Sequence, residues 1–214
     1  MSDPTSEQAP PDRIFPAERL KAFADAVVAI AMTLLILPLM ESVTEPAEGE
    51  GGAWTWIVDH DQQLQSFVLS FVIIAMFWIT HHRVFSRVER VSNGLIWLIM
   101  LWLLSIVWLP VATAMSGQMD SEDKVVIAVY IGSMVLTCLV SLGIRLYLRR
   151  HPALHGIAVQ SLAAGMAVDL SMVILFALSL GVSLLIPAIG YTSLFLMFLT
   201  GLLRRLLGRM PGLR

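Results

Sequence analysis

The sequence contains few charged residues, and this scarcity limits the class of protein it can encode. Asp, Glu, Lys and Arg make up 14% of its 214 residues, against roughly 25% in soluble domains. Hydrophobic residues make up 57%, and the mean hydropathy is +0.78. We therefore expect an all-α integral membrane protein. Since one bilayer-spanning helix needs about 20 apolar residues, the chain has no room for a separate soluble catalytic domain, and we do not expect an enzyme.

Cysteine is nearly absent too, and no strong excess of positive charge is present. Cys138 is the only cysteine, and it lies inside an apolar run. One thiol cannot form an internal disulfide or a four-ligand structural metal site. The net charge of -2 does not favour nucleic acid as a partner. We expect no cofactor, no resident metal and no nucleic-acid partner.

Long apolar runs fill most of the sequence between the two ends. They cover about Leu20 to Met40, Leu64 to Thr80, Gly94 to Met115, Val125 to Leu146, Ile157 to Leu178, and Val182 to Leu203. No charge marks a turn between the last two, and Ser179-Leu180-Gly181 is the expected position because Ser and Gly favour turns. The alternative is one long tilted span there, which would make five spans in all.

Charge alternates from loop to loop, and this alternation predicts the topology. The basic residues, except Lys124, form four clusters: Arg13, Arg19 and Lys21; Arg83, Arg87 and Arg90; Arg145, Arg149 and Arg150; and Arg204, Arg205, Arg209 and Arg214. The intervening loops are acidic, with Glu41, Glu45, Glu48, Glu50, Asp59, Asp61, Asp120, Glu122 and Asp123. Because basic loops stay in the cytoplasm, residues 156–203 must cross twice. The pattern predicts six transmembrane helices with both termini cytoplasmic.

The ends of the chain differ from the apolar runs in composition. Residues 1–15 are polar, acidic and proline-rich, which is typical of a disordered cytoplasmic tail. Residues 16–208 are expected to form one transmembrane domain. Residues 209–214 then form a short basic C-terminal tail.

Two carboxylates inside the apolar runs are candidate functional residues, because an ionisable group in a membrane span is costly. Asp25 lies about one turn into the first run, and His81, His82 and Arg83 match its depth at the end of the second. Asp25 can be an inter-helix anchor, which we favour, or an ion or proton ligand. Asp169 lies near the middle of the fifth run with no basic partner identified, and it can titrate or simply be hydrogen-bonded.

The first run has two distinct faces when drawn as a helix with about 100° per residue. Ile30, Thr33, Leu34 and Leu37 share one face, and Asp25 lies about 140° away from Ile30 by the same rule. Composition alone favours contact of that face with lipid or another helix. The alternative is that several copies line a pore with a hydrophobic constriction and a ring of threonine hydroxyls.

Two sequence blocks resemble a known family. Arg19-Leu-Lys-Ala-Phe23-Ala24-Asp25 resembles the Arg-x-x-x-Phe-Ser-Asp signature of the transmembrane-protein-175 family of potassium channels. Phe77-Trp78-Ile79-Thr80-His81-His82-Arg83-Val84-Phe85 is similar to the family's Trp-x-x-His-His-Arg-x-Phe pattern. The likeness continues through the third run to Pro110. Ala24 departs from the family's serine, which removes a hydroxyl from the polar network.

The resemblance implies a homotetrameric potassium-conducting channel without the re-entrant P-loop of ordinary potassium channels. Helix one would line the central pore, with a constriction formed by Ile30, Thr33, Leu37 and Leu34. Selectivity for K⁺ over Na⁺ would be weak to moderate. Arg19, Phe23 and Asp25 would form a network with Trp78 and with His81 or His82.

The same resemblance predicts partners and a location. The partners are the lipid bilayer, K⁺ and other monovalent cations, and the location is a bacterial plasma membrane, which the chain crosses several times. The rival hypothesis is a proton-coupled transporter or proton leak that uses Asp25 or Asp169.

Overall fold

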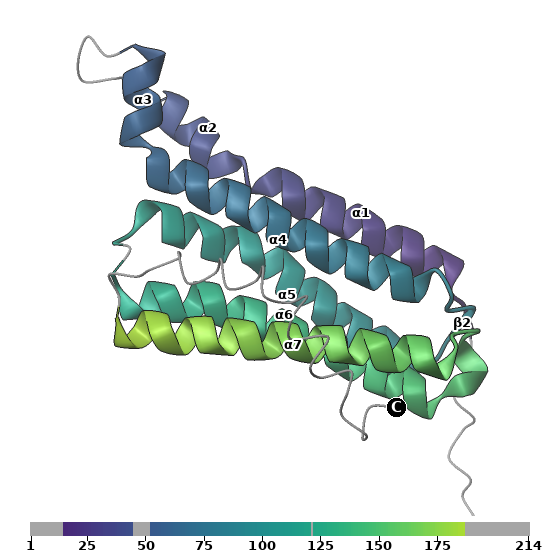
Figure 1. The fold of residues 1–214 in the computed structure, drawn as a ribbon. Coiled ribbons are helices and arrows are strands. Elements are labelled where there is room, and N and C mark those ends of the chain that lie inside the picture. Colours follow the sequence, from purple (N-terminus) through teal and green to yellow (C-terminus); the bar gives the residue numbers. More distant parts are fainter. Residues whose placement is uncertain (1–14, 45–51, 121, 187–214) are drawn as a thin grey trace, which may run out of the picture.

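The computed structural model describes residues 15–44, 52–120 and 122–186, and these residues are mainly helical (Figure 1). The helices are α1 (Glu18–Leu34), α2 (Leu37–Thr44), α3 (Ala53–Asp59), α4 (Asp61–Phe85), α5 (Asn93–Gln118), α6 (Lys124–Arg150) and α7 (Val159–Leu185). Two short strands, β1 (Phe15–Pro16) and β2 (Arg90–Val91), and a 3-10 helix, η1 (Pro152–Leu154), complete the fold. Within the described residues, five stretches are long and apolar enough to cross a membrane, the first of them made of α1 and α2 together.

The long helices run up and down, with α5 in the middle. Helices α1 and α4 pack on one side of α5, α6 packs on the other, and α7 packs on α6 (Figure 1). The core between them is filled by large side chains, among which Trp102, Tyr130 and Ile106 are fully buried. This alternation brings the acidic and basic loops to opposite ends of the bundle. We call the end that carries Arg87, Arg90, Arg149 and Arg150 the basic end.

A break near residue 36 divides the first span, which the sequence predicts as one continuous helix. Helix α1 ends at Leu34, and α2 begins at Leu37. Pro38 explains the break, because it has no N–H to donate to the Leu34 carbonyl and its ring crowds that same carbonyl. Within the break, the Ile36 N–H donates a hydrogen bond to the backbone carbonyl of Thr33, three residues earlier, at 3.3 Å. The span therefore bends at the level of the residues expected in the constriction.

The predicted turn at Ser179-Leu180-Gly181 was wrong, because these residues lie inside α7. The helix continues through these residues to Leu185. An isolated Gly or Ser does not end a helix in an apolar setting, where every backbone group needs an internal partner. The helix stops before Pro187, and Ile186, with φ -131° and ψ 79°, has left the α region, which is disfavoured for a residue that precedes proline. The predicted sixth span, from residue 187 onward, and the tail 209–214 lie outside the described residues.

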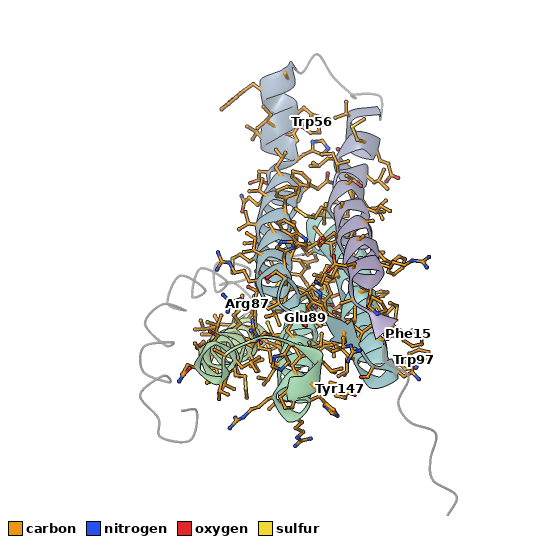
Figure 2. All side chains as sticks on the ribbon, turned by 90° about the vertical axis from the view of Figure 1, so that its right-hand side faces the viewer. Phe15, Trp56, Arg87, Glu89, Trp97 and Tyr147 are labelled. Atoms are coloured by element: carbon orange, nitrogen blue, oxygen red, sulfur yellow. The ribbon has the colours of Figure 1, made fainter. Side chains whose placement is uncertain are left out.

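Short backbone pairings join three segments at the basic end. Phe15, which was expected in the disordered tail, pairs with Val91 in the β1–β2 ribbon, and Val88 forms a bridge with His155. Figure 2 looks onto this end and shows Phe15, Arg87, Glu89 and Tyr147 near it, whereas Trp56 lies at the opposite end. The segment before α1 is thus tied to the α4–α5 loop, and that loop to the α6–α7 loop.

Candidate functional site

One face of α1 packs into the bundle, and the opposite face is open. Val28 and Ala31 are almost fully buried against the core. Ile30 is 59% exposed, Leu37 is 49% exposed and Leu34 is 38% exposed. Three of the four predicted constriction residues are therefore large apolar side chains without cover in the single chain. Such a face needs lipid or another protein chain against it.

Thr33, the fourth of these residues, is the polar member of the open face. Its side chain is exposed, and its Oγ1 donates a hydrogen bond to the carbonyl of Ile30 at 2.7 Å. Because the hydroxyl proton is used in this bond, the free lone pairs of Oγ1 point away from the helix. The open face can therefore offer an oxygen acceptor to a cation.

Asp25 lies near the start of α1 and joins this helix to α4. The indole Nε1 of Trp78 donates a hydrogen bond to Asp25 Oδ1 at 2.8 Å. His82 Nδ1 lies 3.9 Å from the same oxygen, and the rings of His82 and Trp78 are 5.3 Å apart. These contacts cross between two helices that the sequence separates by about fifty residues. Asp25 is therefore placed as an inter-helix contact and points away from the open face.

His81 does not join the Asp25 contacts, and neither do Arg19 and Phe23. The His81 ring stacks between Phe85 and Trp102, at centroid distances of 4.2 and 3.9 Å. Arg19 and Phe23 are exposed, and no hydrogen bond links either of them to Asp25, Trp78 or the two histidines within the described residues. Of the six predicted network residues, the structure brings together Asp25, Trp78 and His82.

A polar cavity of about 380 Å³ lies between α1 and α4 at the basic end. Its lining includes Glu18, Lys21, Asp25, His81 and His82. Lys21 is already paired with Glu18 at 2.8 Å. Within the described residues, no group of three His, Cys, Asp or Glu side chains could hold a metal ion. The cavity can hold water next to Asp25.

A buried ion pair, which the sequence did not predict, joins α6 and α7. The Nε of Arg145 donates to Oδ2 of Asp169, and both side chains are nearly inaccessible, at 9% and 2% exposure. The expectation that Asp169 has no basic partner was wrong. Arg145 was assigned to a basic loop, but it lies inside α6, five residues before the helix ends. Gly165, one turn before Asp169, is the signal that could have shown the pair, because a Cβ there would overlap the guanidinium.

Hydroxyl groups form a second buried contact, between α4, α5 and α6. Thr113 donates to Ser70 Oγ at 2.8 Å, and Ser70 and Tyr130 share a bond of 2.7 Å. One turn further along, Ser116 donates to Ser66 at 3.0 Å. Helices in lipid gain little from the hydrophobic effect, so such bonds and close packing hold them together.

These observations define a multi-span α-helical membrane protein whose first helix has an open face and is anchored through Asp25. Residues 19–110 match the family described as endosomal/lysosomal potassium channel TMEM175. The match covers somewhat less than half of the chain, and the family it describes is one of ion channels. This match agrees with the resemblance to the transmembrane-protein-175 family that the sequence predicts.

Known relatives match part of the chain in sequence and most of it in fold. A potassium channel of Streptomyces collinus is 39% identical over 124 residues, which are 56% of this chain and 59% of that relative. The endosomal/lysosomal proton channel TMEM175 of Gallus gallus is 32% identical over 130 residues, 58% of this chain and 26% of its own length. The crystal structure of a lysosomal potassium-selective channel TMEM175 homolog from Chamaesiphon minutus aligns with a TM-score of 0.67 and 22% identity, over 91% of this chain and 98% of that one. The last likeness concerns the fold.

Proposed function

We propose that the chain is a potassium-conducting cation channel in which four copies surround a central pore lined by α1. The open face of α1 is the observation that carries this proposal. It presents Ile30 and Leu34 with an acceptor oxygen on Thr33, is followed by the exposed Leu37 at the start of α2, and has no cover in the single chain. A ring of four such faces would form a narrow apolar constriction with one layer of hydroxyl oxygens. The relative named a potassium channel supports K⁺ as the permeant ion.

Selectivity in this pore would depend on dehydration. At an apolar constriction a cation loses part of its water shell, and K⁺ loses water at lower cost than the smaller Na⁺. The four Thr33 hydroxyls would replace some of the lost water. Because one ring of neutral oxygens replaces only part of a hydration shell, we expect weak to moderate selectivity for K⁺ over Na⁺.

We also propose six spans with both termini in the cytoplasm of a bacterium, and no re-entrant P-loop. Support comes from the five described spans and from the separation of charge between the two ends of the bundle. The basic end would face the cytoplasm because Lys and Arg accumulate there. A sixth span within residues 187–203 would return the chain to that side, where Arg204 and Arg205 follow, so that residues 16–208 form the channel domain.

The Asp25 contacts give α1 a fixed position in this proposal. Trp78 holds the Asp25 carboxylate on the side facing α4, which leaves the opposite face of α1 free for the pore. The residues that position α1 are then Asp25, Trp78 and His82. In the assembled tetramer, the same network would also include Arg19, Phe23 and His81.

The test is K⁺ flux through purified protein in K⁺-loaded liposomes, with Na⁺ substitution. Ile30→Asn should raise cation flux several-fold and reduce selectivity, because a polar ring would remove the dehydration barrier. Leu104→Asn is the matched control, since Leu104 is also an apolar and exposed side chain, at 66%, but belongs to α5. If Ile30→Asn leaves flux and selectivity unchanged, or if Leu104→Asn has the same effect, α1 does not line the narrowest part of a pore.

A second candidate is a proton leak or proton-coupled transporter that uses Asp25 or Asp169. The relative named a proton channel and the buried position of Asp169 in the middle of α7 favour it. Both carboxylates have partners, Trp78 and Arg145, which argues for structural roles. Proton flux that stops in Asp25→Asn or Asp169→Asn, together with K⁺ flux that requires a proton gradient, would support this candidate over a passive channel.

A further inference from the structure

Backbone hydrogen bonds at the basic end connect the start of α1 to the α6–α7 loop. The peptide groups of Glu89 are the central link. The Glu89 carbonyl accepts from the Ala17 N–H at 3.1 Å, and the Glu89 N–H donates to the Leu154 carbonyl at 3.0 Å. The Gly156 N–H donates to the Arg87 carbonyl at 3.1 Å. We call the three segments 15–17, 86–92 and 151–157 the clasp.

His155 holds its own loop of the clasp with both ring nitrogens. Its Nε2 lies 3.0 Å from the carbonyl oxygen of Leu148, and its Nδ1 accepts the Ile157 N–H at 3.0 Å. A carbonyl oxygen can only accept, so the proton is on Nε2. Nδ1 must then be unprotonated, because it accepts a hydrogen bond. The observed geometry therefore requires the neutral Nε2–H tautomer of a side chain that is only partly buried.

We propose that His155 is a proton-operated latch of the clasp. A proton that adds to Nδ1 turns this acceptor into a donor, and the bond from Ile157 is lost. The turn at 155–157 is then no longer held by a hydrogen bond to the His155 ring. The adjacent backbone hydrogen bonds, from Gly156 to Arg87 and from Glu89 to Leu154, weaken as a result. Since Glu89 also binds the residue that precedes α1, acidification at the basic end loosens the hold on α1.

The charged groups around His155 come from both neighbouring segments. Arg87 and Glu89 flank Val88, its bridge partner, and Glu89 Oε1 lies 3.6 Å from where a Cβ of Gly156 would be. Arg149, Arg150 and His151 are on the α6 side. Histidine side chains ordinarily change charge between pH 5 and 8, and this interval sets the pH range of the test.

His151 provides a matched control within the same loop. Its ring stacks on Tyr147 with centroids 4.1 Å apart, and its Nδ1 lies 2.9 Å from the Tyr147 carbonyl oxygen. Nδ1 is therefore the donor in this bond. A second proton on Nε2 would break no bond that the structure shows, so His151 is not expected to act as a latch.

Hydrogen exchange of the full chain in lipid tests the latch directly. Exchange is measured at about pH 7.5 and about pH 5.5, corrected for the intrinsic rate, on peptides that contain residues 86–92 and 151–157. We expect protection of both segments to fall roughly fivefold at the lower pH, the effect of losing one hydrogen bond. His155→Asn should remove this fall, because an Asn oxygen can accept the N–H two residues on and cannot be protonated in this range. His151→Asn should keep it.

K⁺ flux at the same two pH values, applied at the basic end, tests the consequence for α1, and this part rests on the proposed channel function. Flux of the unmodified chain should change at least twofold between them, and His155→Asn should abolish the change. If no variant conducts at any pH, the channel function fails, and exchange alone decides on the latch. If protection does not change with pH, or changes equally in His155→Asn, the latch is refuted.

Discussion

Removal of Arg145 is the most informative perturbation of the buried core. Arg145→Met keeps the volume and loses the charge, so the Asp169 carboxylate, 2% exposed, remains unpaired in an apolar interior. Breaking a buried pair from one side costs about 3–5 kcal/mol. Asp169→Leu should cost a similar amount, because it leaves the guanidinium without its partner. The double variant Arg145→Met with Asp169→Leu should lie within about 1–2 kcal/mol of the unmodified chain, since a well-packed apolar pair often replaces a buried ion pair without loss.

The assay is reversible unfolding in a detergent titration, evaluated as a double-mutant cycle. The coupling energy between the two sites should exceed about 2 kcal/mol. Arg149→Met is the control, because Arg149 is exposed four residues later on α6, and it should change stability by less than about 0.5 kcal/mol. If the two single losses simply add in the double variant, the pair does not stabilise the α6–α7 contact and the reasoning is refuted.

Two further substitutions test local contacts by the same unfolding measurement. Trp78→Phe removes the N–H that binds Asp25 and should cost about 1.5–3 kcal/mol, the range for a hydrogen bond to a charged group. Trp97→Phe, at a ring 74% exposed, should be nearly neutral. Equal effects of the two substitutions would show that the Trp78 bond contributes nothing. Gly165→Ala places a Cβ against the buried Arg145 guanidinium and should cost about 1–3 kcal/mol. Gly181→Ala, with open space around it, should be neutral or stabilising by up to about 1 kcal/mol. A neutral Gly165→Ala would contradict the close approach of the guanidinium to Gly165.

Much of the fold follows from hydropathy, because spanning helices must be long and apolar. The expected run from Leu64 to Thr80 became α4, Asp61–Phe85, which is longer at both ends. Polar residues such as Asp61 and His82 continue the helix beyond the apolar core, where water and headgroups satisfy them. Hydropathy sees only the apolar part, so it sets the position of each span better than its ends.

Helix interruptions were harder to predict, since they depend on single backbone groups. Pro38 divides the first span, although the apolar run continues through it. Ser179 and Gly181 do not interrupt α7, although both favour turns in water. The difference is chemical: proline removes a donor in any solvent, whereas serine and glycine end a helix only where water can bind the freed backbone.

Side-chain contacts were predicted in part. Matching depth along the chain pointed from Asp25 to the end of α4, where Trp78 and His82 lie. It could not choose between His81 and His82, which diverge by about 100° on the helix. Depth also failed for Arg145 and Asp169, because the long arginine side chain spans the offset between their backbone positions. The periodicity of residues along a single helix gives no information about such a contact between two helices.

The hydroxyl bonds between α4 and α5 have a consequence for how two nearly featureless apolar helices find their register. Leu and Ile side chains pack almost equally well after a slide of one helical turn, and lipid does not penalise the shift. Ser66 with Ser116 and Ser70 with Thr113 bond at successive turns. If one helix moved by one turn along the other, at least one of these hydroxyl groups would lose its hydrogen-bond partner in an apolar environment. The four small polar side chains therefore fix the register between α4 and α5. Hydropathy averaged along the sequence cannot detect this effect.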